Sequence, residues 1–423
     1  MGRLQLNVVK INKDEVGEFL QFLSEIGRVG QTGVTRLAYT EDWVAAMQYC
    51  QQFAKTNGLE VLQDELGNIS VRLEGKTKAD TVSTGSHIDT QINGGRYDGA
   101  LGVVGGLIAL KALKEQFGQP QKTIETIIFC EEEGSRFPNA GFWGSRGIVG
   151  KIRKEDLVET LSFDGKLIRD CMIDVGLKPD RFKTAIRDKL GAFIELHIEQ
   201  GPLLEENNLS VGLVTSITGM AQFEVILEGK DNHAGTCPMD MRIDPMSGFA
   251  EISLALLDQA HQLGRPYVTT IGQVFVEPGG VAIIPKRIRF SIDARHPDPK
   301  LRKEFYAIQD KVMRDICDRR GLSYSQKCLL DIEPCESDKN LINVMKVAAG
   351  ELGLQTRTVE SGAGHDAQQI SEISPVAMIF VRSAHGVSHT PDEFSTLSDC
   401  TAGVSLLAQT LYNLAYKPQI DHL

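Results

Sequence analysis

Short apolar runs alternate with a helical pattern along the first half of the chain. TVSTGS (81–86), TIETIIFC (123–130) and AFIELHIE (192–199) are rich in β-branched and apolar residues, which is typical of buried strands. GALGVVGGLIALKALKEQFG (99–118) has apolar residues at helical spacing and ends at a glycine, which predicts a helix. The order strand, helix, strand predicts an α/β domain built on a mixed, mostly parallel sheet.

The pattern changes from about residue 214 onward. Four strand-like segments and two amphipathic helices follow one another in the order β-α-β-β-α-β, which is a split βαβ or ferredoxin-like unit. We therefore expect an inserted second domain at 214–333, while 1–213 and 334–423 form the first domain. In the second part of that first domain, SPVAMIFVRS (374–383) predicts a further strand. The segments of the insertion are the strands 220–229, 267–280, 287–296 and 322–332 and the helices 244–264 and 300–321.

Composition restricts the classes of partner. A chain of 423 residues suggests two or three domains. The net charge of −11 argues against nucleic acid or an anionic membrane as a partner, since both need a basic face. A small anionic substrate would need a local arginine or lysine. Eight scattered cysteines without a C-x-x-C pair, and the lack of a signal-peptide or membrane-spanning pattern, predict a cytoplasmic protein.

The loop GSHIDTQINGGRYDG (85–99) places His87, Asp89 and Asp98 after an apolar strand. Imidazole and carboxylate together suit divalent transition metals such as zinc or manganese. We expect His87 to bind an ion while Asp89 accepts its second ring N–H and fixes the tautomer. Asp98 follows a flexible glycine run and is suited to bridge two ions. Taken one at a time, these residues are better explained as turn residues and, for His87, as an ordinary loop histidine.

Three adjacent glutamates, Glu131, Glu132 and Glu133, end the strand at 123–130. Three neighbouring carboxylates repel one another unless cations neutralise them. A solvated acidic turn is the alternative, but the preceding IIFC is apolar enough to be buried. Because neighbours in an extended segment point to opposite sides, we expect Glu133 to bind a metal while Glu132 faces the substrate as a general base.

Two more histidines follow predicted strands. His197 lies in ELHIEQG, where a hydrogen-bonded core histidine is the alternative, and His389 lies in GVSHTPDE. Ligands of open α/β sheets bind beyond the carboxyl ends of the strands, so these residues are expected to meet. The combined set is the mixed nitrogen and oxygen set of a two-metal hydrolase. Its members are His87, Asp98, Glu133, His197 and His389.

Seven motifs in the chain are shared with one group of enzymes. They are GSHIDT (85–90), NGGRYDG (93–99), EEEGSRF (131–137), HIEQG (197–201), NHAGT (232–236), SGAGHDA (361–367) and SHTPDE (388–393). With them the chain resembles the M20-type metallopeptidase and amidase superfamily, and within it the amidase/hydantoinase/carbamoylase group, over essentially its whole length.

The resemblance implies two divalent ions per subunit, manganese or zinc. One ion would be held by His87, Asp98 and His197, and the other by Asp98, Glu133 and His389, with Asp98 bridging. Glu132 would be the general base.

The resemblance also makes the inserted domain a lid that forms a homodimer. In it, His233 would stabilise the oxyanion, within its own subunit or across the dimer, and Arg295 would bind a substrate carboxylate through its planar fork. A surface arginine at a strand end is the alternative for Arg295. Further substrate contacts are implied for Gln200 and for the backbone of Gly362 and Gly364.

The implied reaction is hydrolysis of a carbamoyl (ureido) C–N bond. FWGSR (142–146), Asn232 and Gln368 resemble the allantoate-hydrolysing members, which would yield ureidoglycine, carbon dioxide and ammonia in purine catabolism. An N-carbamoyl-L-amino acid, ureidoglycolate or β-ureidopropionate is the alternative substrate. An aminopeptidase of the same superfamily and a catalytically inactive binding protein are the rival classes.

Two positions depart from the pattern of the group. Ala282 stands where the group usually has an asparagine that contacts substrate, and His385 stands where an asparagine usually precedes glycine. We expect His385 either to supply a substrate contact or to be a loop residue.

Overall fold

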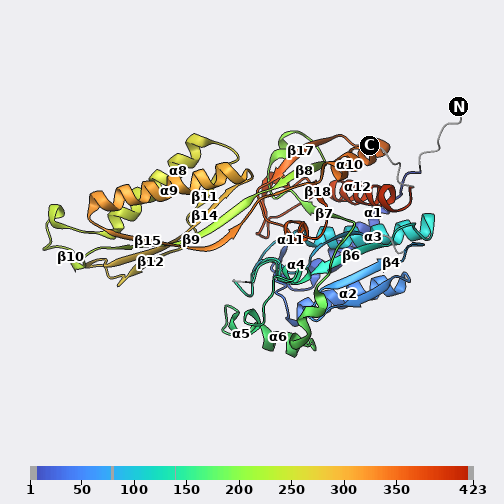
Figure 1. The fold of residues 1–423 in the computed structure, drawn as a ribbon, viewed down its shortest axis with the longest axis horizontal. Helices are drawn as coiled ribbons and strands as arrows, with labels where there is room; N and C mark the ends of the chain where they lie inside the picture. The colour runs from blue at the N-terminus through green and yellow to red at the C-terminus, as the bar shows by residue number, and fades with distance from the viewer. Residues whose placement is uncertain (1–6, 78–80, 139, 418–423) are drawn as a thin grey trace. The chain divides into compact units, whose positions relative to one another are not determined.

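The computed structural model describes residues 7–77, 81–138 and 140–417 (Figure 1). The chain divides into two compact units. The first consists of Met1–Thr215, Glu336–Val359 and His365–Leu423, and the second of Ser216–Cys335 and Glu360–Gly364. Within the described segments, no helix combines the length and the apolar character needed to cross a membrane.

The first unit is built on a mixed sheet with a parallel centre. The order of the central strands is β18 (Val376–Val381), β7 (Ala192–Ile198), β5 (Val82–His87) and β6 (Ile124–Phe129), and every pair among them is parallel. All residues of these four strands are buried, as expected for a parallel sheet covered on both faces. The apolar runs therefore predicted these strands correctly.

Antiparallel strands extend this sheet on both sides, so it is more mixed than the sequence predicted. On one side β8 pairs with β18, and on the other β4 pairs with β6 and β3 with β4. The flanking and smaller strands are β8 (Val211–Ile217), β4 (Ile69–Leu73), β3 (Glu60–Gln63), β16 (Cys335–Glu336), β17 (Thr356–Ser361), β1 (Arg28–Val29) and β2 (Gly33–Val34).

Helices cover this sheet. The helix α3 (Ala100–Phe117) packs on β5, β6 and β7 and against α1 and α12, while α11 packs on β7 and β18. Besides α3, the helices of this unit are α1 (Lys13–Glu25), α2 (Glu41–Thr56), α4 (Trp143–Ile148), α5 (Asp156–Glu159), α6 (Ile168–Asp174), α7 (Leu203–Glu206), α10 (Lys339–Leu352), α11 (Asp366–Ile370) and α12 (Leu397–Ala415), with 3₁₀ turns η1 (Pro179–Ala185) and η3 (Ala384–Gly386).

Glycines in α3 allow the helix to approach the sheet closely. A Cβ on Gly102 would lie 2.3 Å from the carbonyl oxygen of Leu196 in β7, and one on Gly106 would lie 2.6 Å from Thr126 in β6. Gly99 caps the start of α3 with a positive φ of 62°. Asp98 directly precedes this cap, and its carboxylate lies beside His87 at the end of β5 and His197 near the end of β7.

The second unit is an antiparallel sheet covered by two helices. Its central strands β9 (Gly219–Glu228) and β14 (Arg287–His296) pair over their full length, and β15 (Ser323–Ile332) pairs with the other edge of β9. Burial alternates strictly along β14, which indicates that one face packs on the helices. Those helices are α8 (Pro245–Leu263) and α9 (Pro299–Arg320), which pack on each other and on the sheet (Figure 1).

The segment 267–280, predicted as one strand, forms two. They are β11 (Val268–Thr270) and β12 (Val274–Glu277), and each pairs with a different part of β14. A small hairpin of β10 (Asn232–His233) and β13 (Ile283–Ile284), together with the turn η2 (Met239–Met241), was not predicted. Two-residue strands leave no hydrophobic period that a sequence pattern could reveal.

Candidate metal centre

Four segments carry the candidate ligands to one edge of the central sheet. His87 ends β5, Glu132 and Glu133 follow β6, and His197 lies near the end of β7. His389 follows β18 after a short turn. Since parallel strands present their carboxyl ends at the same edge, residues far apart in sequence meet there.

Two buried imidazoles are oriented by backbone carbonyls. Nδ1 of His87 lies 3.0 Å from the carbonyl oxygen of Asp89, and Nδ1 of His197 lies 2.9 Å from that of Ile198. A carbonyl only accepts, so each Nδ1 carries a proton and each Nε2 can offer a lone pair. These Nε2 atoms lie 3.4 Å (His87) and 3.1 Å (His197) from Oδ1 of Asp98.

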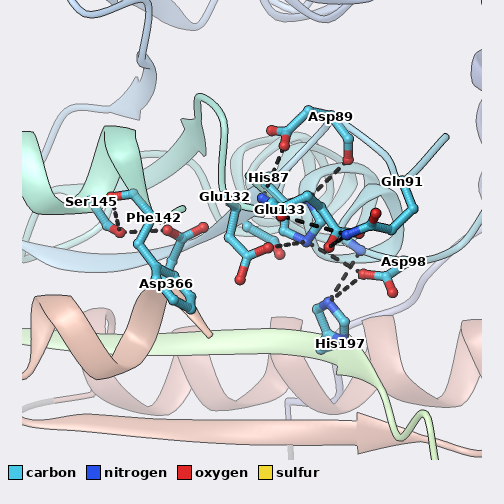
Figure 2. Close-up of polar contacts among 12 residues, drawn as sticks. His87, Asp89, Gln91, Asp98, Glu132, Glu133, Phe142, Ser145, His197 and Asp366 are labelled. Atoms are coloured by element: carbon cyan, nitrogen blue, oxygen red, sulfur yellow. Dashed lines mark hydrogen bonds and ion pairs between the residues drawn. The ribbon is translucent and has the colours of Figure 1, made fainter. Parts of the chain in front are cut away.

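The Asp98 carboxylate has imidazoles on two sides, and Figure 2 shows it beside His197. While Oδ1 faces His87 and His197, its other oxygen, Oδ2, lies 3.2 Å from Nε2 of His389. The same His389 nitrogen lies 3.6 Å from Oε2 of Glu133. Asp98 therefore has the position of a bridging ligand between two groups.

Within the described residues, three groups of side chains bring ligand atoms within 4.8 Å of one another. All five ligands expected from the sequence belong to at least one of them. The groups are His87, Asp98 and His197; His87, Glu132 and Glu133; and Asp98, Glu133 and His389.

Glu132 and Glu133 do not point to opposite sides as an extended chain would require. Oε2 of Glu132 lies 3.6 Å from Nε2 of His87, and ligand atoms of both glutamates share one group with that histidine. Glu131, directly before them, has a positive φ of 51° in the left-handed region, so the extended strand conformation has already ended there. The carboxylate of Glu131 instead accepts the Phe137 N–H at 2.9 Å.

Asp89 accepts the second ring N–H of His87, as predicted. Its backbone carbonyl, rather than its carboxylate, accepts the second ring N–H of His87. The carboxylate oxygen Oδ2 accepts the backbone N–H of Glu133 at 3.1 Å. Asp89 thus supports two candidate ligands at once, from two different atoms.

Burial and neighbouring charges shift the pKa values of the cluster. Burial opposes a charge on His87, but the carboxylates of Glu132 and Asp98 outweigh it and raise its pKa well above the ordinary value. Burial would raise the pKa of Asp98, yet His197 and the other imidazoles hold it well below its usual range. Burial raises the pKa of Glu132 strongly, and burial with the neighbouring Asp98 charge raises that of Glu133 to about 7.

His389 differs from the other two imidazoles in its exposure. Its side chain is 47% exposed, whereas those of His87 and His197 are buried. Burial opposes a charge on His389, but Asp98 and Glu133 raise its pKa to about 9. The cluster thus has one open side, at His389.

Gln200, expected to contact substrate, lies inside this cluster. Its amide Nε2 donates to Oδ2 of Asp98 at 2.7 Å and lies 3.3 Å from Nε2 of His389. His385, by contrast, has an 86% exposed side chain. Its backbone N–H donates to Glu205 at 2.8 Å, and its Nδ1 lies 3.8 Å from the same carboxylate. These contacts hold the backbone at His385 and leave most of its ring exposed.

The remaining predicted residues lie in the second unit. Arg295 on β14 is held by Asp293 through contacts of 2.7 and 3.1 Å, and its Nη1 donates to the carbonyl of Gly362 at 3.0 Å. Gly364 belongs to the same short segment of this unit. His233 is exposed on β10, and its Nδ1 accepts N–H groups from Gly235 and Thr236 at 3.0 and 3.2 Å.

Comparisons with known proteins show to which family the chain belongs. The model of peptidase family M20/M25/M40 matches residues 80–413. The chain belongs to this family. This M20 protein is 39% identical to the allantoate amidohydrolase of Bacillus subtilis (strain 168), over 96% of the chain and 98% of that protein. It is 36% identical to the N-carbamoyl-L-amino-acid amidohydrolase of Pseudomonas sp. (strain NS671), over 96% and 99% of the two chains.

A solved structure shares the same fold. The crystal structure of an amidase of the hydantoinase/carbamoylase family from Burkholderia multivorans superposes with a TM-score of 0.87. The two are 30% identical, and the match covers 97% of this M20 protein and 99% of that chain. The M20 α/β fold with its mixed sheet is therefore established for the chain.

The residues of the M20 cluster suit divalent cations. Oε1 of Glu133 is buried and has no hydrogen-bond partner, and the Nε2 atoms of His87 and His197 are directed at Asp98. Burial is the main cause of the raised pKa values of Glu132 and Glu133, and it outweighs the lowering effect of His87 on both and of His389 on Glu133. A nitrogen and oxygen set of this composition is typical of zinc and manganese.

Several residues that hold this cluster together were not predicted from the sequence. Gln91 donates to Oε2 of Glu133 at 2.9 Å, and Ser388 lies 2.9 Å from Oδ2 of Asp98. Glu393 accepts backbone N–H groups of the Asp98 loop. All three lie in or directly beside the motifs of this M20 protein, which was the one available indication of their role.

Proposed function

We propose that this M20 protein is a metal-dependent amidohydrolase that cleaves a carbamoyl (ureido) C–N bond, with allantoate as substrate and ureidoglycine, carbon dioxide and ammonia as products. The observation that carries the proposal is the convergence of three imidazoles with the carboxylates of Asp98, Glu132 and Glu133. The similarity to amidohydrolases over nearly the full chain supports it.

Two divalent ions, manganese or zinc, are proposed as cofactors. His87, Asp98 and His197 would hold one, and Asp98, Glu133 and His389 the other. When bound, the ions would supply Lewis acidity at the substrate carbonyl and at a water molecule.

Glu132 is proposed as the general base. Its carboxylate lies in the same group as the candidate ligands, and burial gives it a pKa well above that of an ordinary glutamate. A carboxylate with a raised pKa accepts a proton from water more readily and can pass it on to the leaving nitrogen. This one side chain would therefore serve as base and then as acid.

Two residues of the second unit are proposed to bind the substrate. Because Nδ1 of His233 accepts two backbone N–H groups, its proton lies on Nε2, which is free to donate to an oxyanion. Arg295 is oriented by Asp293, and its guanidinium would bind the substrate carboxylate. Gln200, the exposed imidazole of His385 and the backbone of Gly362 and Gly364 are proposed as further contacts.

We further propose that 1–213 and 334–423 form the metal-binding domain and that 214–333 is a ferredoxin-like lid that also forms a homodimer. The strand order β11-β14-β9-β15 with two helices supports the ferredoxin-like assignment. Exposed apolar side chains, including Met239 and Met241 in η2 and Leu254 on α8, support an interface on this unit.

A cytoplasmic location and a role in purine catabolism are also proposed. No disulfide joins the cysteines that the structure describes, which fits a reducing compartment. The net charge of −11 fits a small-molecule substrate rather than nucleic acid or membrane partners.

An N-carbamoyl-L-amino acid is the second candidate substrate, since a relative named for that activity is 36% identical. The test is a substrate panel with protein loaded with Mn²⁺ or Zn²⁺, in which ammonia release is followed. We expect allantoate to have the highest kcat/KM. A higher kcat/KM for an N-carbamoyl amino acid would make that compound the proposed substrate instead of allantoate. If no ureido acid released ammonia, the amidohydrolase assignment would be contradicted.

A further inference from the structure

Glu393 connects the two loops that carry Asp98 and His389. Its carboxylate is 2% exposed and follows His389 by four residues. One oxygen, Oε1, accepts two consecutive backbone N–H groups, from Tyr97 at 2.8 Å and from Asp98 at 3.0 Å. These bonds fix the backbone at Asp98 although the partners lie almost 300 positions apart along the chain.

The second oxygen of Glu393 reaches the side chain of Asp98 through Ser388. Oγ of Ser388 lies 2.7 Å from Oε2 of Glu393 and 2.9 Å from Oδ2 of Asp98. This is the same Asp98 oxygen that lies 3.2 Å from Nε2 of His389. Glu393 therefore contacts Asp98 twice, once through the backbone and once through a hydroxyl.

The loop around Asp98 is shaped to admit this carboxylate. A Cβ on Gly95 would lie 2.0 Å from the carboxyl carbon of Glu393, so any other residue there would displace it. On the other side, His389 has a positive φ of 59°, a conformation that side-chain-bearing residues rarely adopt and that the surrounding contacts must hold. The Ser388–Glu393 bond lies directly beside this residue.

We infer that Glu393 is a positioning residue that locks the Asp98 loop to the His389 loop and so sets the affinity for the ion shared by Asp98, Glu133 and His389. The inference rests on the proposed function, because it assumes that these residues hold an ion. His87 and His197 are oriented by backbone carbonyls independently of Glu393, so the ion between them and Asp98 should be less affected.

The experiment measures metal binding rather than turnover. Full-length wild type, Glu393→Ala, Glu393→Gln and Ser388→Ala are freed of metal and dialysed against Mn²⁺. The ions per chain are counted, and the Kd of each ion is obtained by competition with a chelator. Asp392→Asn is the matched control, since Asp392 is the exposed acidic neighbour in the same turn.

We expect wild type to bind two ions per chain. Glu393→Ala should raise the Kd of the ion held by Asp98, Glu133 and His389 by about 10- to 100-fold, an effect typical of residues that orient metal ligands. Glu393→Gln should raise this Kd less, because its amide oxygen can still accept the two backbone N–H groups. Ser388→Ala should also raise this Kd, whereas Asp392→Asn should bind both ions with wild-type Kd values.

Wild-type Kd values for both ions in Glu393→Ala and Ser388→Ala would overturn the inference. If Glu393→Ala fails to fold, as judged by circular dichroism, the Kd values of Glu393→Gln and Ser388→Ala are used instead. Wild-type Kd values in both of these variants would then overturn the inference. Failure of the wild type to bind two ions would instead contradict the proposed function, so the two failures are distinguishable.

Discussion

Oδ1 of Asp98 lies 3.1 Å from Nε2 of His197, deep in the first unit. The other oxygen of the same carboxylate faces His389, so Asp98 is shared by both candidate ion positions. We predict that Asp98→Asn loses both ions, because an amide supplies one neutral oxygen in place of two charged ones. His389→Ala should lose only one ion. Metal content after dialysis checks both, and two retained ions in Asp98→Asn would show that Asp98 is not a bridging ligand.

Much of the first unit follows from local sequence. The four central strands are short apolar runs, and the glycine-rich pattern at 99–118 predicted α3. The five candidate ligands were predicted because histidines and acidic residues follow apolar runs, and the carboxyl ends of parallel strands meet.

Other features depend on contacts that no local pattern encodes. The extended conformation ends at Glu131, and ligand atoms of Glu132 and Glu133 share one group, whereas the sequence predicted opposite sides. Whether a carbonyl or a carboxylate of Asp89 accepts from His87 is decided by backbone geometry of the loop. The contact of Glu393 with Tyr97 joins positions almost 300 residues apart.

A buried ion-pair network in the first unit should control acid stability. The fully buried Glu125 accepts from Arg72 at 2.8 Å and from Arg187 at 2.6 Å. Burial would raise its pKa, but the two guanidinium groups outweigh burial and lower it. We predict that Glu125→Gln lowers the free energy of unfolding at pH 7 by about 3 kcal/mol, measured with urea, because two guanidinium groups lose their counter-charge.

The pH dependence of this effect has a definite sign. Because the folded pKa of Glu125 is depressed, its contribution is present above the unfolded value of about 4.3 and is lost as the pH falls through the folded pKa. The difference between wild type and Glu125→Gln should therefore shrink below about pH 4. Glu25→Gln, which removes the exposed pair with Arg28, is the control and should change little. A difference that grows on acidification would contradict this account.

Two glycine substitutions in helices should have opposite effects. Gly102→Ala would place a Cβ 2.3 Å from the Leu196 carbonyl, and we expect it to destabilise the protein by about 1–3 kcal/mol. Gly350 lies exposed in α10 with open space around the position of a Cβ, so Gly350→Ala should stabilise by about 0.5–1 kcal/mol. Chemical unfolding measures the free energy of unfolding of both variants. A change of the same sign in both would be inconsistent with the close packing of α3.

Arg295→Lys should raise KM for allantoate far more than it lowers kcat. Lysine keeps the charge but loses the planar fork that Asp293 orients, so we expect kcat/KM to fall about 10- to 100-fold, as for a lost charged hydrogen bond. Arg289→Lys on the same strand is the control, because Arg289 pairs with Glu224 and lies over Phe275. An unchanged KM in Arg295→Lys would exclude Arg295 as the carboxylate anchor.

The most direct test of the central claim compares ammonia release from allantoate by Mn²⁺-loaded wild type and Glu132→Gln, with the bound ions counted in both. We predict release by the wild type and a loss of at least about 100-fold in Glu132→Gln, which can no longer take the proton, while both proteins bind two ions. Near-normal turnover by Glu132→Gln, or no release by a wild type that holds two ions, would contradict the account.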